Sequence, residues 1–364
     1  SSIACWGLDN YGQAGGTPGG SFQPSTVFIT VGANASGIEA GDRHTCANLD
    51  DGSMYCWGNN FGGQLTRSNL NEHSSMPLEI PLSSSVTQIM AGGDSTCAIT
   101  DDGWLSCWGS NDHGQRGDGS VCTIEGLSGC PLSLSAGNHV PVKVYLDDTP
   151  AVVTVSAGTS HTCATMTDGS IQCWGANDVG QLGDGSNVDR HYPSTVVTNW
   201  TDPSLRYPYH WDEQITMGRS IGVASGLDFT CASFTTEGSS YNTTTSHQWN
   251  PSGGKTGQIY CWGSNTYGIL GDSCCFNNNT TIANALEPHY IVSGGAVSAG
   301  GYFVCGDGDC WGHNVNLSIG PGNIPDGESG RAGNTLDGYG ELDVGHSHGC
   351  GIISDGERIG ITEG

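Results

Sequence analysis

Turn-forming Asp-Gly pairs recur along the chain, and several of them lie between two short segments that carry a cysteine. The clearest example runs from Cys163 to Cys173, with Asp168 and Gly169 midway between them. Glycine tolerates the positive φ that a tight hairpin needs, so this pattern predicts two antiparallel strands joined by a short turn. Because the cysteines stand about equally far from the turn, we expect them to face each other. The 59 glycines and the charged fraction of 13% favour many such strands and few amphipathic helices.

The predicted hairpin belongs to a unit that occurs six times, and every copy contains Cys-Trp-Gly. The six tryptophans are Trp6, Trp57, Trp108, Trp174, Trp262 and Trp311. A period near fifty residues with four short strands per unit is typical of a β-propeller, in which each unit forms one blade. No blade buries its apolar face alone, so we assign the tryptophan to packing between blades. Polar insertions explain the longer intervals, and we therefore predict one all-β domain over residues 1–364, a six-bladed β-propeller.

The cysteines predict a disulfide in every blade. Five pairs lie within single units: Cys46–Cys56, Cys97–Cys107, Cys163–Cys173, Cys231–Cys261 and Cys305–Cys310. Cys5 lacks an upstream partner, and the missing half-unit stands at the other end of the chain with Cys350. We therefore predict a Cys5–Cys350 disulfide and a first blade built from about residues 341–364 together with 1–16, which closes the ring through its own terminal strands.

Four further cysteines lie outside the repeat: Cys122, Cys130, Cys274 and Cys275. They permit three pairings. A Cys122–Cys130 disulfide closes a local loop and is favoured. It leaves Cys274 and Cys275 either as a strained vicinal disulfide or as thiols that cross-link another chain.

Cysteine usage of this kind predicts an oxidising compartment, and we expect a mature secreted chain. Six Asn-x-Ser/Thr sites are the candidate glycosylation positions for a eukaryotic source: Asn34, Asn199, Asn242, Asn278, Asn279 and Asn316. The net charge of −26 repels nucleic-acid phosphates and anionic lipid. We therefore expect neither a nucleic-acid partner nor membrane insertion.

Candidate chemistry is sparse. His44, His161 and His348 stand two residues before a blade cysteine, but other blades hold Ser95, Phe229 or Phe303 there, so we interpret these histidines as structural. Asp-Gly pairs at Asp118 and Asp184, with Asp272 alongside, offer oxygens to calcium, yet none matches a known calcium loop and turn chemistry is favoured. No catalytic motif is present. We predict a non-enzymatic protein with no metal or cofactor site. If any ion binds, calcium is the candidate.

The string Gly-x-x-His-Thr-x-Ala, Asp-Gly-Ser, Trp-Gly-x-Asn-x-x-Gly-Gln-Leu-Gly resembles the repeat of the regulator of chromosome condensation family of β-propellers. The resemblance covers nearly the whole chain, and the cysteines are similar to those of secreted members. The family pattern has seven blades, whereas six are counted here, and a basic tail is missing. Some members act on small GTPases or chromatin, against which the acidic charge and disulfides argue. Others, such as a secreted inhibitor of β-lactamases, bind a protein through loop faces, which is the closer analogy.

These inferences predict an extracellular binding module that recognises a protein or a glycan through loops on a propeller face. The alternative is a structural subunit of an extracellular filament, coat or appendage, built from copies of the chain itself. A repeated core leaves little freedom for a unique site, so we place function on four insertions, at residues 120–140, 192–219, 238–255 and 274–289. The candidate binding residues are Trp200, Tyr207, Tyr209 and Trp211 of the second insertion and Trp249 of the third.

Overall fold

The protein is described from a computed structural model. It describes residues 2–16, 23–120, 139–144, 146, 151–197, 199–200, 215–216, 219–235, 257–266, 270, 284–293, 297–299, 303–306, 309–312, 330–331, 339–344 and 348–353. All regular elements in these ranges are β-strands, which confirms the all-β prediction. No helix among them is long and apolar enough to cross a membrane.

The described strands form six four-stranded sheets and one two-stranded sheet, all antiparallel. One sheet joins both chain ends, in the order β2 (Gln23–Ile29), β1 (Ser2–Gly7), β26 (His348–Ile353) and β25 (Tyr339–Val344). The next contains β3 (Ala35–Ala40), β4 (His44–Leu49), β5 (Met54–Gly58) and β6 (Ser74–Glu79). The third contains β7 (Val86–Ala91), β8 (Ser95–Thr100), β9 (Leu105–Gly109) and β10 (Val142–Lys143).

The remaining sheets follow the same plan. The fourth contains β11 (Val152–Ala157), β12 (His161–Met166), β13 (Ile171–Gly175) and β14 (Arg190–Thr195). The fifth contains β17 (Ser220–Ser225), β18 (Phe229–Thr235), β19 (Gly257–Gly263) and β20 (Ala285–Ser293). The sixth contains β21 (Val297–Ala299), β22 (Phe303–Gly306), β23 (Asp309–Gly312) and β24 (Gly330–Arg331). The two-stranded sheet pairs β15 (Asn199–Trp200) with β16 (Ile215–Thr216).

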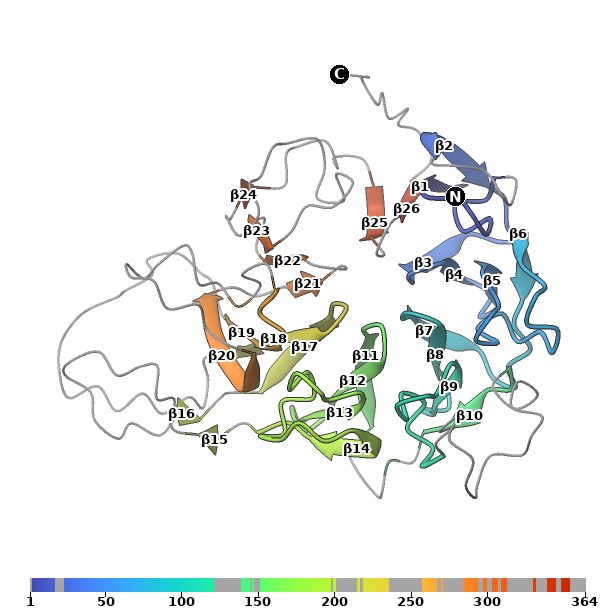
Figure 1. The fold of residues 1–364 in the computed structure, drawn as a ribbon. Helices are drawn as coiled ribbons and strands as arrows, with labels where there is room; N and C mark the ends of the chain where they lie inside the picture. Colours follow the sequence, from blue (N-terminus) through green and yellow to red (C-terminus); the bar gives the residue numbers. More distant parts are fainter. Residues whose placement is uncertain are drawn as a thin grey trace.

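The sheets are arranged around a common centre, with β3, β7, β11 and β17 nearest to it (Figure 1). Contacts link the first strands of neighbouring sheets from β25 through β3, β7, β11 and β17 to β21. Each of these strands is the edge of its sheet, hydrogen-bonded to one neighbour only. Such an arrangement places the repeated sheets side by side like the blades of a propeller.

The hairpins form as the sequence predicts. Gly52, Gly103 and Gly169 have φ of 84°, 82° and 85°, the left-handed conformation that glycine adopts at low cost. In the fourth sheet this turn sets Cys163 directly opposite Cys173. Disulfides join the cysteine pairs of four sheets: Cys46–Cys56, Cys97–Cys107, Cys163–Cys173 and Cys231–Cys261. In the sixth sheet the backbone register likewise pairs Cys305 with Cys310.

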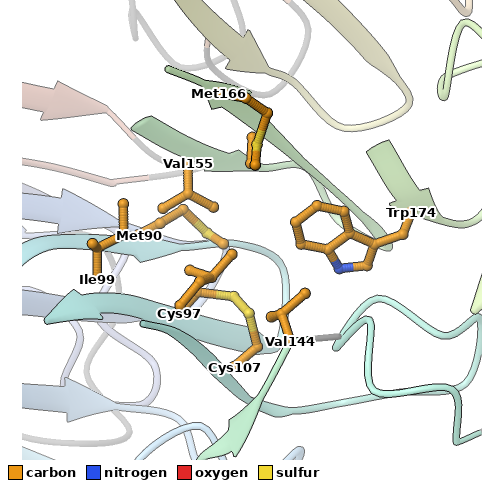
Figure 2. Packing of buried hydrophobic residues seen from close by; sticks show 10 residues of the cluster. Met90, Cys97, Ile99, Cys107, Val144, Val155, Met166 and Trp174 are labelled. Atoms are coloured by element: carbon orange, nitrogen blue, oxygen red, sulfur yellow. A yellow bond between two sulfur atoms is a disulfide. The ribbon is translucent and has the colours of Figure 1, made fainter. Parts of the chain in front are cut away.

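Neighbouring sheets pack through the repeated tryptophan. Figure 2 shows one such contact, where Met90, the Cys97–Cys107 disulfide and Val155 lie near the indole of Trp174. Trp174 is fully buried, and its Nε1–H donates to the backbone carbonyl of Gln115, in the loop after β9 of the preceding sheet, at 2.9 Å. The same 2.9 Å bond recurs for three other tryptophans, Trp57, Trp108 and Trp262, with the carbonyls of Gln13, Gln64 and Gln181. The tryptophan therefore serves packing between sheets.

The two chain ends share a sheet. β1 pairs with β26 over its whole length, and the register sets Cys5 opposite Cys350. Within the insertion at 192–219, the described residues contribute to β14 and to the small β15–β16 ladder, in which Trp200 pairs with Ile215. The described part of this insertion thus forms no four-stranded sheet of its own.

Candidate binding surfaces

Two kinds of loop leave the sheets at opposite ends. Because the strands are antiparallel, loops joining the first to the second strand emerge at the same end as loops joining the third to the fourth. We call this the loop end; residues 41–43, 59–73 and 92–94 belong to it. Turns joining the second to the third strand, at 50–53, 101–104 and 167–170, form the hairpin end.

The four predicted insertions fall at different connections along the chain. Residues 120–140 lie between β9 and β10, and residues 274–289 run from beyond β19 into β20. Residues 238–255 lie between β18 and β19, and residues 192–219 run from within β14 to the start of β17. Two boundaries differ from expectation, since residues 192–195 belong to β14 and residues 285–289 to β20.

Most of the predicted binding residues fall outside the described ranges. These are Tyr207, Tyr209, Trp211 and Trp249, together with Cys122, Cys130, Cys274, Cys275, Asn242, Asn278, Asn279, Asn316 and Asp272. The backbones of Trp200 and Asn199 lie in β15, and that of His348 lies in β26. Asn34 is exposed just before β3, at a position that a glycan could occupy.

A cavity of about 300 Å³ lies among the first strands of five sheets. Among the residues that the structure describes, the lining includes Glu39 and Asp42 and no lysine, arginine or histidine. The lining strands are the inner edges of their sheets, and the backbone groups of such an edge need a polar partner or water. The cavity is therefore polar.

Backbone hydrogen bonds link successive sheets at the loop-end mouth of this cavity. The N–H of Asp42 donates to the carbonyl of Gly92 at 3.2 Å, and the N–H of Gly93 donates to the carbonyl of Gly158 at 3.1 Å. The N–H of Thr159 continues the series to Leu227 at 3.1 Å. These bonds hold the inner loops of four sheets in register with one another.

An aromatic cluster lies on the loop end, formed by Tyr11, Phe61 and His73. The ring centroids are 5.7 Å apart for Tyr11 and Phe61, 5.0 Å for Tyr11 and His73, and 4.6 Å for Phe61 and His73, all edge to face. The guanidinium of Arg43 lies 5.9 Å from the Tyr11 centroid. Phe61 stays 44% exposed. The cluster joins the sheet shared by the chain ends to the sheet that follows it.

Short hydrogen bonds within the loops fix the two ring-bearing tips. The Tyr11 N–H donates to Gln13 Oε1 at 3.0 Å, and the Phe61 N–H donates to Asn59 Oδ1 at 2.7 Å. His73 Nδ1 accepts the backbone N–H of Asn60 at 3.4 Å. Burial lowers the pKa of His73, which keeps this ring uncharged at neutral pH.

The carboxylates near the cluster are in an environment that disfavours their negative charge. Burial raises the pKa of Asp94, and the neighbouring Asp112 carboxylate raises it further, against the lowering effect of Arg43 and of Gln64. Gln64 Nε2 donates to Asp94 Oδ1 at 2.9 Å. Further round the loop end, burial and Asp178 raise the pKa of Asp228 in the same way.

Carboxylates of the hairpin end have the opposite environment. Asp51 Oδ1 accepts the N–H and the hydroxyl of Ser53, and these bonds lower the pKa of Asp51. Asp168 is stabilised by Ser170 in the same manner. The acids of the hairpin end are thus satisfied within their own turns, whereas those around the aromatic cluster are not.

The histidines singled out in the sequence join neighbouring sheets. His44 Nε2 lies 3.0 Å from Thr96 Oγ1, and His161 Nε2 lies 2.8 Å from Thr230 Oγ1. Both rings are buried, and burial lowers the pKa of His161 to about 4. These contacts give the two side chains a structural role.

The candidate calcium aspartates have partners within the chain. Asp118 Oδ2 lies 3.0 Å from Arg116 Nη2, and Asp184 Oδ2 lies 2.7 Å from Arg190 Nη2. Their other oxygens accept from Ser120 and Ser186 in tight turns. The described ranges contain no group of three or more His, Cys, Asp or Glu side chains suited to a metal ion.

Sequence reasoning missed the aromatic cluster. Tyr11 and Phe61 occupy the variable tip of the Trp-Gly-x-Asn-x-x-Gly-Gln loop in two different repeats, and His73 precedes β6. The sequence signal that could have revealed the cluster was an aromatic residue at the loop tip of two successive repeats. Their meeting depends on how neighbouring sheets stack.

The sheet plan and the stacking define the class: a β-propeller built from repeats. Models of the regulator of chromosome condensation (RCC1) repeat match residues 35–64, 86–115 and 152–181 in one form and 51–99, 102–165 and 168–233 in another. Together they run from residue 35 to 233, more than half of the chain. The protein belongs to the RCC1 repeat family.

Among curated relatives, the chain is 35% identical over 243 residues to the ultraviolet-B receptor UVR8 of Arabidopsis thaliana, covering 60% of this chain and 52% of that one. It is 30% identical over 214 residues to the probable E3 ubiquitin-protein ligase HERC4 of Homo sapiens, covering 58% of this chain and 18% of that one. The chain thus spans about half of the first relative and a smaller part of the second.

Solved structures agree on the fold. Yeast RCC1 (Prp20), bound to Kap60, matches with a TM-score of 0.66 at 17% identity, covering 98% of this chain and 77% of that one. Human WBSCR16 matches with a TM-score of 0.61 at 17% identity, covering 97% of this chain and 100% of that one. A further Prp20p structure is described with its binding to Gsp1p and histones. The expected exclusion of small GTPases as partners finds no support in these comparisons.

Proposed function

We propose that the chain is an extracellular, non-enzymatic binding module, a six-bladed propeller that holds a protein partner through the loop end. One observation carries the proposal: the repeated side chains are used in packing between sheets, while the loop tips differ from sheet to sheet. The same 2.9 Å bond fixes Trp57, Trp108, Trp174 and Trp262. The tips beside them range from Phe61 to the acidic Asp112 and Asp178.

The ring closure belongs to the proposal. The pairing of β1 with β26 supports it, as do the contacts of β25 and β26 with β3. Cys5 is disulfide-bonded and fully buried, and Cys350 is the residue opposite it in the register. A ring closed in this way removes the free end that a row of stacked sheets would otherwise expose.

The extracellular setting is supported by the disulfides. The eight cysteines of the four disulfides within single sheets are fully buried, in the strands that carry the core. A reducing compartment would leave such pairs as thiols. UVR8 is a receptor by name and yeast RCC1 was solved with Kap60 bound, which supports a role in binding.

Site-directed photo-cross-linking tests the placement of the binding surface. A benzophenone amino acid replaces, in separate full-length variants, Phe61 at the loop end, Trp104 at the hairpin end and Met76 on the outer strand β6. These side chains are 44%, 49% and 73% exposed, so all three are accessible. Each variant is irradiated in extracellular material from the source organism.

We expect a discrete adduct with a different protein from the Phe61 position alone. Adducts made of copies of this chain would instead favour the structural subunit, and a carbohydrate adduct would favour a glycan ligand. A partner cross-linked only from the Trp104 or Met76 position, or none from any, contradicts the proposal.

A further inference from the structure

We infer that the aromatic cluster of Tyr11, Phe61 and His73 anchors a basic protein segment, in which lysines or arginines flank an apolar or aromatic residue. This inference rests on the proposed function and names the partner chemistry of the same loop end. It concerns one part of that end, where the sheet shared by the chain ends meets the sheet of β3 to β6.

The geometry of the cluster suits an anchor. Its three rings meet edge to face at centroid distances of 4.6 to 5.7 Å, and Phe61 remains 44% exposed. Hydrogen bonds within each loop already fix both tips, at 3.0 Å for the Tyr11 N–H and 2.7 Å for the Phe61 N–H. A side chain packed against Phe61 therefore gains apolar contact without ordering a flexible loop first.

Charge selects the partner. Arg43, the cation beside the cluster, lies over the Tyr11 ring and opposes the charge of Asp94. Asp112 is exposed and lies close enough to Asp94 to raise its pKa, so it adds a second negative charge. Arg67 and Glu72, on the same loop as Phe61, contribute one charge of each sign, so Asp94 and Asp112 against Arg43 leave the described residues of this region net negative. A basic segment complements this arrangement.

The same charge disfavours a second copy of the chain. The protein carries 36 acidic and 10 basic residues, a net charge of −26, so two copies repel each other. An acidic partner meets the same repulsion. Burial is the main cause of the raised pKa of Asp94, and Asp112 raises it further against the lowering effect of Arg43, whereas the hairpin-end acids, which are hydrogen-bonded in their own turns, have lowered pKa values.

Peptide binding to the full-length protein tests the inference. The probes are three fluorescein-labelled peptides measured by anisotropy at low and high salt: Gly-Lys-Lys-Phe-Lys-Lys-Gly, the same peptide with Ala for Phe, and the same peptide with Glu for every Lys. The site variants are Phe61→Ala and Asp112→Asn. Matched controls are Phe28→Ala, an exposed phenylalanine on the outer strand β2, and Asp51→Asn, an exposed aspartate of the hairpin end.

The basic phenylalanine peptide should bind best, with affinity falling as salt rises. Phe61→Ala should weaken it about tenfold and Asp112→Asn about threefold, with less salt dependence in the latter. The two controls should bind as the wild type does. Equal binding of the acidic peptide, equal losses in the controls, or no binding at about 1 mM peptide overturns the inference.

The cross-linking test of the proposed function and the peptide test of this inference can fail independently of each other. A protein adduct at Phe61 without any preference for the basic peptide leaves the proposed function standing and removes the inference. A basic-peptide preference lost in Phe61→Ala, with the natural partner cross-linked only at the hairpin end, retains the surface chemistry and removes the proposed function. Melting temperatures of all four variants exclude unfolding as the cause of any loss.

Discussion

In the loops that the structure describes, the third residue after the repeat tryptophan organises the loop through its side chain. Asn60 Oδ1 accepts the N–H of Leu65 at 2.9 Å, while its Nδ2 donates to the carbonyls of Arg67 and Asn69, both at 3.0 Å. Asn111 and Asn177 use the same geometry. The first repeat has Asp9 in this place, whose Oδ1 accepts the N–H of Ala14 at 2.8 Å.

Asp9→Asn should therefore stabilise the protein. Burial raises the pKa of Asp9, so its charged form is disfavoured in the folded state. The asparagine keeps the acceptor and removes the buried charge, and we expect the free energy of unfolding to rise by about 1 kcal/mol at pH 7. The gain should shrink as the pH falls, because protonation neutralises Asp9 in the folded wild type. Denaturant unfolding measures both effects.

The reverse change provides the control. Asn60→Asp introduces the same buried carboxylate into the next repeat and removes two donated hydrogen bonds. It should destabilise the protein, and most strongly at neutral pH. If Asp9→Asn and Asn60→Asp changed the free energy of unfolding in the same direction and by the same amount, this account of the loop would be wrong.

His161 should make stability depend on pH. Burial lowers its folded pKa to about 4 from 6.5, so the folded state keeps the ring neutral while the unfolded chain takes up a proton. The neutral His161 ring makes its full contribution to the free energy of unfolding above pH 6.5. That contribution, on the order of 3 kcal/mol, is lost progressively as the pH falls towards 4. The comparison variant is His161→Phe, the residue that the next sheet holds at this place as Phe229. The difference in unfolding free energy between wild type and variant should fall with pH over this window; a constant difference contradicts the prediction.

At the scale of elements, the inner loops are the places where sheets approach most closely. Gly92 follows β7, and a Cβ added there would lie 2.7 Å from the carbonyl oxygen of Gly158 and 2.8 Å from the Cβ of Ala157. That carbonyl also accepts the N–H of Gly93 at 3.1 Å. The third and fourth sheets can therefore pack at this spacing only if residue 92 has no side chain.

Gly92→Ala should destabilise the protein by about 1–3 kcal/mol, because backbone atoms must move to accept the methyl group. Gly32→Ala is the matched control: a Cβ at Gly32 meets no atom within 4 Å. We expect the control to be neutral or slightly more stable, since alanine restricts the unfolded chain. Thermal unfolding distinguishes the two, and equal melting temperatures would remove the close-packing argument.

At the scale of the whole molecule, closure depends on the chain ends. We predict that Cys5 is disulfide-bonded to Cys350, which stands opposite it in the β1–β26 register. Non-reducing peptide mapping should recover the two cysteines in one linked fragment. Cys350→Ser should leave Cys5 reactive to alkylation and lower stability, with about 5–6 kcal/mol as the upper limit from chain entropy. Recovery of Cys5 linked to any other cysteine would contradict ring closure.

Local chemistry made the hairpins predictable. Asp-Gly at 168 and 169 determines a turn through the positive φ of glycine, and cysteines set symmetrically around it must meet. The repetition of Cys-Trp-Gly determined that the same sheet recurs, because a residue kept in every unit serves contacts that every unit makes. Boundaries were less accurate: residues 285–289 read as a polar insertion, yet they pair with β19, a choice made by the neighbouring strand.

The sequence by itself thus determined the all-β class, the repeated hairpin and the cysteine pairs within it, since each depends on residues close together in one unit. Only the tertiary structure decided which loop tips meet. Tyr11, Phe61 and His73 belong to two repeats and come together because neighbouring sheets stack at a fixed spacing. The same stacking leaves Asp94 beside Asp112 and Arg43, while Asp51 is satisfied within its own turn. Contacts within a unit follow from local sequence, whereas contacts between units depend on how the units are placed.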